Sequence, residues 1–196
     1  MNLPNKLTVS RFGLTGVFLL AMFVEFPLHK TVALLLFSAA GLTDFFDGRI
    51  ARRDGLITNF GILMDPLADK ILTCSAFIAF VGLGFMSAWM VVIVVARELA
   101  ITGLRLLAAS KNVVLAAEGY GKHKTISQIV AIISVLVMVS YRDWGNPGVM
   151  VFGFEILGRP WVNGFADFSK WVAVGLTFFS GAFYLWRNRE LYLRDL

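Results

Sequence analysis

Long apolar segments separated by short polar links make up most of the chain. Each segment is close to the roughly 20 apolar residues that a helix needs to cross the hydrocarbon core of a bilayer. They lack the alternation of apolar and polar residues that marks the strands of a membrane barrel. The pattern therefore predicts an all-α polytopic membrane protein with six transmembrane helices, near 7–24, 31–52, 61–85, 87–109, 125–141 and 168–186.

Composition supports this prediction and limits the number of domains. The 196 residues are 58% hydrophobic and 16% charged, with a mean hydropathy of +0.74, whereas about a quarter of a soluble domain is charged. Six crossings use up most of the chain, so we expect one transmembrane domain over 1–196. The first apolar segment lacks a small-residue cleavage pattern and is expected to be retained as a span. The one cysteine, Cys74, excludes a disulfide framework.

Positive charge predicts both the orientation and the partners. The net charge is +5, but no basic patch interleaved with aromatic residues suggests nucleic acid, so anionic headgroups or a phosphorylated substrate fit better. With the N-terminus inside, the external parts hold only Lys30, Arg142, Arg159 and Lys170. The positive-inside rule then places both termini, and the links at 49–61 and 111–124, in the cytoplasm. The loop at 142–167 is expected to be external.

Four aspartates interrupt two of the apolar segments. At about 100° per helical residue, Asp44 and Asp47 share a face with Gly48, Ala51 and Arg52. In the next segment Gly61, Asp65 and Asp69 are four residues apart and also share a face. Converging carboxylates need a counter-charge, and an all-oxygen ligand set suits Mg²⁺, Mn²⁺ or Ca²⁺. Together with the arginine, this pattern predicts a metal-bound diphosphate at the cytoplasmic end of the helices.

The spacing of these residues carries a family resemblance. The string Asp44-x2-Asp47-Gly48-x2-Ala51-Arg52-x8-Gly61-x3-Asp65-x3-Asp69 resembles the signature of the CDP-alcohol phosphotransferases. That resemblance implies six transmembrane helices, a homodimer and two Mg²⁺ or Mn²⁺ ions in each active site.

The resemblance also implies a role for each residue. Asp44, Asp47 and Asp65 would bind the metals, with Asp44 and Asp65 bridging them, and Asp69 would complete the second site and act as general base. Gly48, Ala51, Arg52 and Thr58 would bind the CDP-diacylglycerol, and Asn5 and Thr8 would line its nucleotide end.

Four further cations indicate the acceptor. Arg97 and Arg105 lie eight residues apart in an apolar helix, about 80° around its axis, so both can face one cavity. Lys122 and Lys124 begin the following segment, and the four outnumber the nearby Glu98 and Glu118. Arginine and lysine suit a phosphate monoester, so a phosphorylated acceptor is expected.

The strings NLPNKLTVSR, RELAITGLRLLAAS and GKHKTISQ are similar to the bacterial branch of the family that uses glycerol 3-phosphate. This similarity implies that phosphatidyl transfer to glycerol 3-phosphate releases CMP and yields phosphatidylglycerol phosphate, a step of phospholipid biosynthesis in the bacterial inner membrane. Arg97, Arg105, Lys122 and Lys124 would then hold the acceptor phosphate.

Several alternatives stay open at this point. A cardiolipin synthase or an inositol-phosphate transferase would share the same signature. An Asp-rich intramembrane prenyltransferase also binds metal diphosphates, but its acidic motifs are spaced differently. A cation transporter would use the acids as an ion path and would have no need of Gly48, Ala51 and Arg52 on the acidic face. Nothing pairs His29 or His123 with other metal-binding side chains, so both are expected in loops or interfaces.

Overall fold

The computed structural model describes residues 3–54, 59–111, 120–156 and 158–193, most of them helical. The long helices in these parts of the chain match the six predicted segments in order. They are α1 (Leu3–Phe23), α2 (His29–Asp54), α3 (Asn59–Gly82), α4 (Ala88–Ser110), α5 (Tyr120–Ser140) and α7 (Trp161–Arg187). The largest difference from the prediction is in α7, which begins at Trp161 rather than near 168. The all-α class is thus confirmed.

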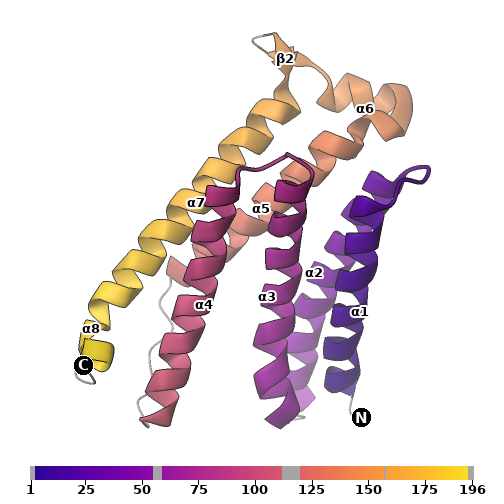
Figure 1. The fold of residues 1–196 in the computed structure, drawn as a ribbon. Helices are drawn as coiled ribbons and strands as arrows, with labels where there is room; N and C mark the ends of the chain where they lie inside the picture. Colours follow the sequence, from indigo (N-terminus) through magenta and orange to yellow (C-terminus); the bar gives the residue numbers. More distant parts are fainter. Residues whose placement is uncertain (1–2, 55–58, 112–119, 157, 194–196) are drawn as a thin grey trace.

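Successive long helices run up and down in a bundle (Figure 1). The described ends of α1 and of α8 (Arg189–Leu193) lie at the lower end of the view, so the chain starts and finishes on the same side. The C-terminal half of α2, the N-terminal half of α3 and the C-terminal half of α4 reach that lower end as well. This topology places the signature segments and Arg105 in the lower half of the bundle, with Arg97 near the middle of α4.

Apolar residues fill the inside of the bundle and also cover much of its outside. Phe18, Phe77, Phe80, Ile132 and Leu136 are fully buried, at 0% exposure. Large apolar side chains also stand exposed on every long helix, among them Leu20, Leu35, Ile78, Leu99, Ile129 and Phe179. A soluble monomer rarely exposes such extended apolar surface. The composition and this outward-facing surface together identify a membrane protein.

Two described helical segments are both long and apolar enough to cross a membrane: His123–Phe152, with 30 residues, and Trp161–Arg187, with 27. Shorter apolar stretches cover Val9–Phe23, His29–Leu42 and Lys70–Gly82. The remaining long helix, α4, carries Arg97 and Glu98 near its middle and Arg105 in its second half, which lowers its apolar character. The six-span topology stays a prediction.

The α5–α7 interface contains neutral hydrogen bonds. The Nε2 atom of Gln128 donates to Oγ1 of Thr177 at 3.0 Å, and the hydroxyl oxygens of Ser134 and Ser169 are 2.6 Å apart. All four residues are buried. Small polar residues let helices approach closely, and each such hydrogen bond in a membrane stabilises the pair by about 0.6 kcal/mol on average.

The segment predicted as an external loop is largely ordered. It contains a 3₁₀ turn, Tyr141–Trp144, the helix α6 (Gly145–Phe152), and the antiparallel strands β1 (Glu155–Ile156) and β2 (Arg159–Pro160). Gly158 lies at the turn between the strands with φ of +77°, a left-handed conformation that glycine adopts without steric cost. Thr31 on α2 receives a hydrogen bond from Trp144 Nε1 at 3.1 Å and donates to Asp143 Oδ2 at 3.2 Å. These bonds fix the segment to the top of α2.

Candidate active site

The four signature aspartates lie at helical positions near the lower end of the bundle. Asp44 and Asp47 are in the C-terminal half of α2, and Asp65 and Asp69 are in the N-terminal half of α3. Their side chains are outside the described residues, as are those of the other predicted nucleotide-site residues and one acceptor lysine: Asn5, Thr8, Gly48, Ala51, Arg52, Thr58 and Lys122. The helical positions agree with the predicted faces, and the metal ligation itself stays a prediction.

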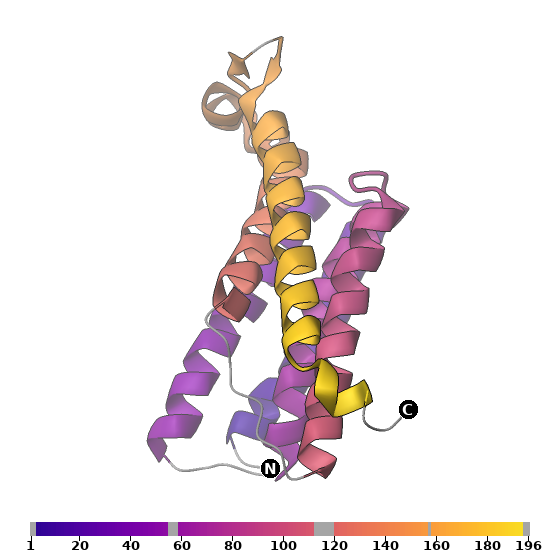
Figure 2. The ribbon, with the colours of Figure 1, turned by 90° about the vertical axis from the view of Figure 1, so that its left-hand side faces the viewer.

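The backbone shows how the two aspartate-bearing helices are held. Both α2 and α3 pack against α1. In Figure 2 the C-terminal end of α2 diverges from the lower ends of α3 and α4. Convergence of the two aspartate pairs is accordingly a prediction. Among the side chains that the structure describes, no group of three or more His, Cys, Asp or Glu could hold a metal ion.

Glu98 is the centre of a buried charged cluster on α4. Its Oε1 accepts a hydrogen bond from Lys124 Nζ on α5, and Arg97 Nη1 donates to the same oxygen at 3.3 Å. Glu98 and Lys124 are each only 5% exposed. An unpaired charge at such a position would be costly. One carboxylate therefore holds two of the cations that the sequence assigned to the acceptor phosphate.

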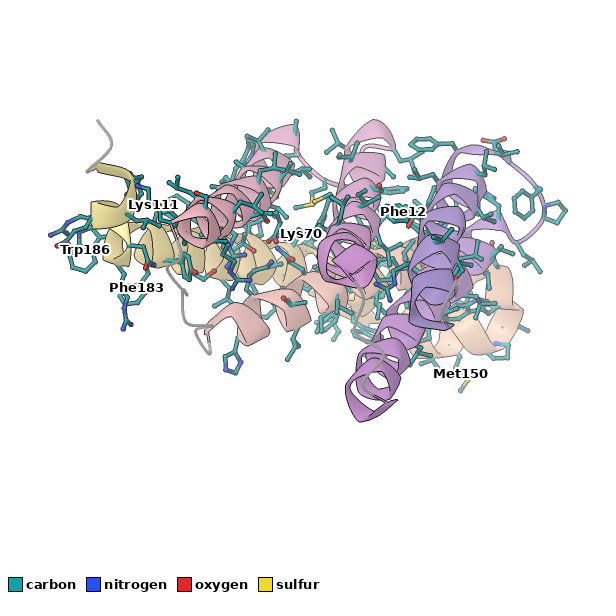
Figure 3. All side chains as sticks on the ribbon, turned by 90° about the horizontal axis from the view of Figure 1, so that it is seen from below. Phe12, Lys70, Lys111, Met150, Phe183 and Trp186 are labelled. Carbon is teal, nitrogen blue, oxygen red and sulfur yellow. The ribbon has the colours of Figure 1, made fainter. Side chains whose placement is uncertain are left out.

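A second set of hydrogen bonds joins this cluster to α3. The hydroxyl of Thr102 donates to the backbone oxygen of Glu98 at 2.7 Å and accepts a hydrogen bond from Lys70 Nζ. Figure 3 looks at the bundle from its lower end and shows Lys70 between α3 and α4. Because Lys70 directly follows Asp69 in α3, the predicted general base and the cluster around Glu98 lie at the same level of the bundle.

Arg97 and Arg105 both contact α7, and whether they share a cavity for the acceptor phosphate stays a prediction. The stem of Arg97 packs against Gly181, where an added Cβ would lie 2.6 Å from Arg97 Cγ. The guanidinium carbon of Arg105 lies 5.9 Å from the centre of the Tyr184 ring, within cation–π range. Their surroundings differ, because Arg97 is half-buried in the Glu98 cluster while Arg105 is exposed.

Sequence reasoning missed most of the residues that hold these cations. It counted Glu98 only as a partial counter-charge, and it did not single out Thr102, Gly181 or Tyr184. Glu98 carried a signal, since an acid within an apolar helix requires a partner, but the partner Lys124 is 26 residues away. Glycine and threonine in an apolar helix carry no comparable signal. His29 is the first residue of α2, with its Nδ1 3.0 Å from the oxygen of Ala21. His123 is an exposed residue of α5, so both histidines are helical rather than in loops.

Comparison with known proteins supports the signature independently. Residues 1–179 match the family described as CDP-alcohol phosphatidyltransferase. A protein of Bacillus subtilis (strain 168) is 38% identical over 201 residues, which cover 96% of each chain, and is named CDP-diacylglycerol–glycerol-3-phosphate 3-phosphatidyltransferase. A protein of Rickettsia bellii with the same name is 33% identical over 93% of each chain.

A relative from Mycobacterium tuberculosis (strain ATCC 25618 / H37Rv) is named a probable phosphatidylglycerophosphate synthase. It is 44% identical over 134 residues, or 67% of this chain and 64% of its own. The resemblance predicted from the spacing of eight motif positions is thus confirmed over nearly the whole sequence. The chain belongs to the CDP-alcohol phosphatidyltransferase family.

Proposed function

We propose that this protein transfers the phosphatidyl group of CDP-diacylglycerol to glycerol 3-phosphate, with phosphatidylglycerol phosphate and CMP as products. The observation that carries the proposal is the similarity, end to end, to relatives named for this reaction, at 38% and 33% identity. The buried cluster of Arg97, Lys124 and Glu98 beside the helical position of Asp69 supports it, because a phosphorylated acceptor needs cations near the base.

In this mechanism Asp69 takes the proton of the acceptor hydroxyl. The hydroxyl oxygen then forms a bond to the β-phosphorus of CDP-diacylglycerol, and the bond from that phosphorus to the bridging oxygen breaks. CMP leaves with the bridging oxygen. Arg97, Arg105, Lys122 and Lys124 hold the acceptor phosphate, so the hydroxyl of a bound acceptor is kept close to Asp69.

Two divalent cations, Mg²⁺ or Mn²⁺, would be held by Asp44, Asp47, Asp65 and Asp69. These four carboxylates form an oxygen-only donor set, which fits a hard cation. When bound, such ions stabilise charge on the attacking and leaving oxygens. Gly48, Ala51, Arg52 and Thr58 would contact the cytidine diphosphate, and Asn5 and Thr8 would line the nucleotide end.

We also propose a multi-pass homodimer in the bacterial inner membrane, with six spans and both termini in the cytoplasm. The Lys and Arg distribution supports this orientation. The lower end of the bundle would then face the cytoplasm, where glycerol 3-phosphate and CMP are soluble.

The test is the dependence of CMP release on the acceptor. Purified protein in detergent with Mg²⁺ or Mn²⁺ is expected to release CMP from CDP-diacylglycerol only when glycerol 3-phosphate is added. Equal release with phosphatidylglycerol or inositol phosphate would show that the acceptor assignment is wrong. No release with any acceptor would contradict the proposed activity as a whole.

A further inference from the structure

The carboxylate of Glu98 has no role in the reaction proposed above, yet it is buried and holds two cations. It binds a lysine of α5 and an arginine of its own helix through one oxygen. The backbone of the same residue accepts the hydroxyl of Thr102, which in turn is bound by Lys70 of α3. Three helices therefore meet at one turn of α4.

We propose that Glu98 is a positioning residue for the acceptor phosphate, acting through Lys124 and Arg97. This inference rests on the proposed function and deepens it. It concerns a group that would not touch the substrate itself. The carboxylate would hold the two cations at fixed places before the acceptor arrives, so that acceptor binding does not have to order them.

This arrangement avoids a loss of conformational entropy when the acceptor binds, because the long side chains are already ordered. Lysine and arginine have many rotamers, and a large part of that freedom is lost when the head group is fixed. In this structure the loss occurs on folding, because the ammonium of Lys124 is buried against Glu98. The head group of Lys124 is therefore held in place before the acceptor binds.

The charge balance of the cluster also favours an incoming anion. One carboxylate faces two cations, so Arg97, Lys124 and Glu98 together carry one net positive charge. A neutral residue at 98 would remove the carboxylate that these two cations share, and cations that lose such a partner move toward water or toward other acids. A glutamine there would keep the shape of the side chain and still accept a hydrogen bond from Lys124, but it would lose the ionic attraction.

The hydrogen bonds through Thr102 fix the Glu98 cluster relative to α3. Lys70 follows the predicted base in α3 and bonds to Thr102 one turn after Glu98 in α4. The register between α3 and α4 is thereby fixed at the level where the acceptor hydroxyl must meet its base. A displacement of the phosphate-binding cations would change that distance directly.

The first measurement compares Glu98→Gln with wild type in steady-state kinetics for both substrates. We expect the KM for glycerol 3-phosphate to rise at least tenfold while the KM for CDP-diacylglycerol changes by less than twofold. Glu98→Asp keeps the charge on a shorter stem and is expected to show an intermediate rise. The matched control is Glu155→Gln, because Glu155 is exposed in β1 at the other end of the molecule.

A double-mutant cycle separates positioning from a general loss of structure. If Glu98 acts through Lys124, the double variant Glu98→Gln/Lys124→Gln should have nearly the same acceptor KM as Lys124→Gln alone. In both variants the lysine that Glu98 positions is already missing. Fully additive effects would overturn the proposal. So would an unchanged or lowered acceptor KM in Glu98→Gln, or equal rises in both KM values.

Two results keep the proposal distinct from the function on which it rests. A wild-type protein that neither turns over nor is thermally stabilised by glycerol 3-phosphate would overturn the proposed function, and the role of Glu98 with it. If the wild-type protein turns over and is stabilised by glycerol 3-phosphate, but the acceptor KM of Glu98→Gln equals that of wild type, only the role of Glu98 is overturned. If Glu98→Gln does not fold, the KM values of Glu98→Asp decide: a selective rise for the acceptor supports positioning, and none overturns it.

Discussion

The α5–α7 interface and the charged junction formed by Glu98, Arg97 and Lys124 place polar groups inside the same bundle in opposite ways. Between α5 and α7, the neutral donors and acceptors are matched, with Gln128 bound to Thr177 and Ser134 to Ser169. Around Glu98, one carboxylate faces Arg97 and Lys124. Both regions are buried, but among the described side chains the second has two cations around one carboxylate.

The difference indicates which polar groups stabilise the fold and which serve a ligand. Matched neutral pairs satisfy each other and need no further partner. Two buried cations that share one carboxylate suit the proposed binding of an anionic acceptor. The two regions lie on neighbouring helices, which allows substitutions in one to serve as controls for the other.

The largest expected effect comes from Asp69, the predicted base beside the charged junction. Asp69→Asn should lower kcat by about 10²- to 10⁴-fold, the usual range for removal of a general base. Binding of CDP-diacylglycerol, measured by thermal stabilisation, should be mostly retained. The control is Asp167→Asn at the other end of the bundle, where the carboxylate pairs with Arg159 and Lys170. Lost binding with unchanged turnover at saturation would disprove the assignment.

Arg105 tests whether the exposed cation of α4 belongs to the charged junction. Arg105→Ala should raise the KM for glycerol 3-phosphate by about tenfold, because hydrogen bonds to a charged group contribute about 1.5–3 kcal/mol. Arg105→Lys should recover part of the loss, since it keeps the charge but not the planar fork. Arg159→Ala, at an exposed ion pair far from the junction, is the control. An acceptor KM that does not respond to Arg105→Ala would remove this residue from the phosphate site.

The order and class of the long helices could be predicted from the sequence because apolar runs dominate it. The start of α7 was placed too late because 161–167 mixes apolar residues with Gly, Asn and Asp, which lowers its hydropathy without preventing a helix. The ordered segment between α5 and α7 was missed for a related reason. Short helices and a two-residue hairpin depend on tertiary bonds, such as that of Trp144 to Thr31, and these leave no periodic signal.

In the candidate site, the signature motif could be recognised from the sequence, but the residues that hold the cations in place could not. Arg97 and Arg105 could be assigned to one face because helical spacing alone decides that. The bond from Lys124 to Glu98 depends on how α4 and α5 pack, which no local pattern encodes. The contact between Arg97 and Gly181 depends in the same way on α4 and α7.

Gly181 allows the junction to be disturbed without removal of any charge. In Gly181→Ala the new Cβ would lie 2.6 Å from Arg97 Cγ, which forces the arginine stem or α7 to move. Overpacking of this kind typically costs about 1–3 kcal/mol of stability. The acceptor KM is expected to rise severalfold as Arg97 shifts. Gly175→Ala on the same helix has no atom within 4 Å of its added Cβ, so it should leave the acceptor KM unchanged and should not lower stability, because alanine is the better helix former. Equal effects from the two variants would show that the contact with Arg97 is not the cause.

The smallest effect is expected where the polar pair is neutral. Thr177→Val leaves the buried Gln128 amide without its partner and should cost about 1 kcal/mol of unfolding free energy. The double variant with Gln128→Leu should recover most of that stability, because both polar groups are then replaced by apolar ones. The coupling energy expected from the cycle is near 0.6 kcal/mol, the average for such bonds in membranes, measured by unfolding in mixed detergent micelles. Both KM values should stay within twofold of wild type throughout, since nothing charged has moved. If the double variant folds but its acceptor KM rises tenfold, the α5–α7 interface also takes part in the site. The presence of charged groups would then not distinguish the ligand-binding region from the structural one.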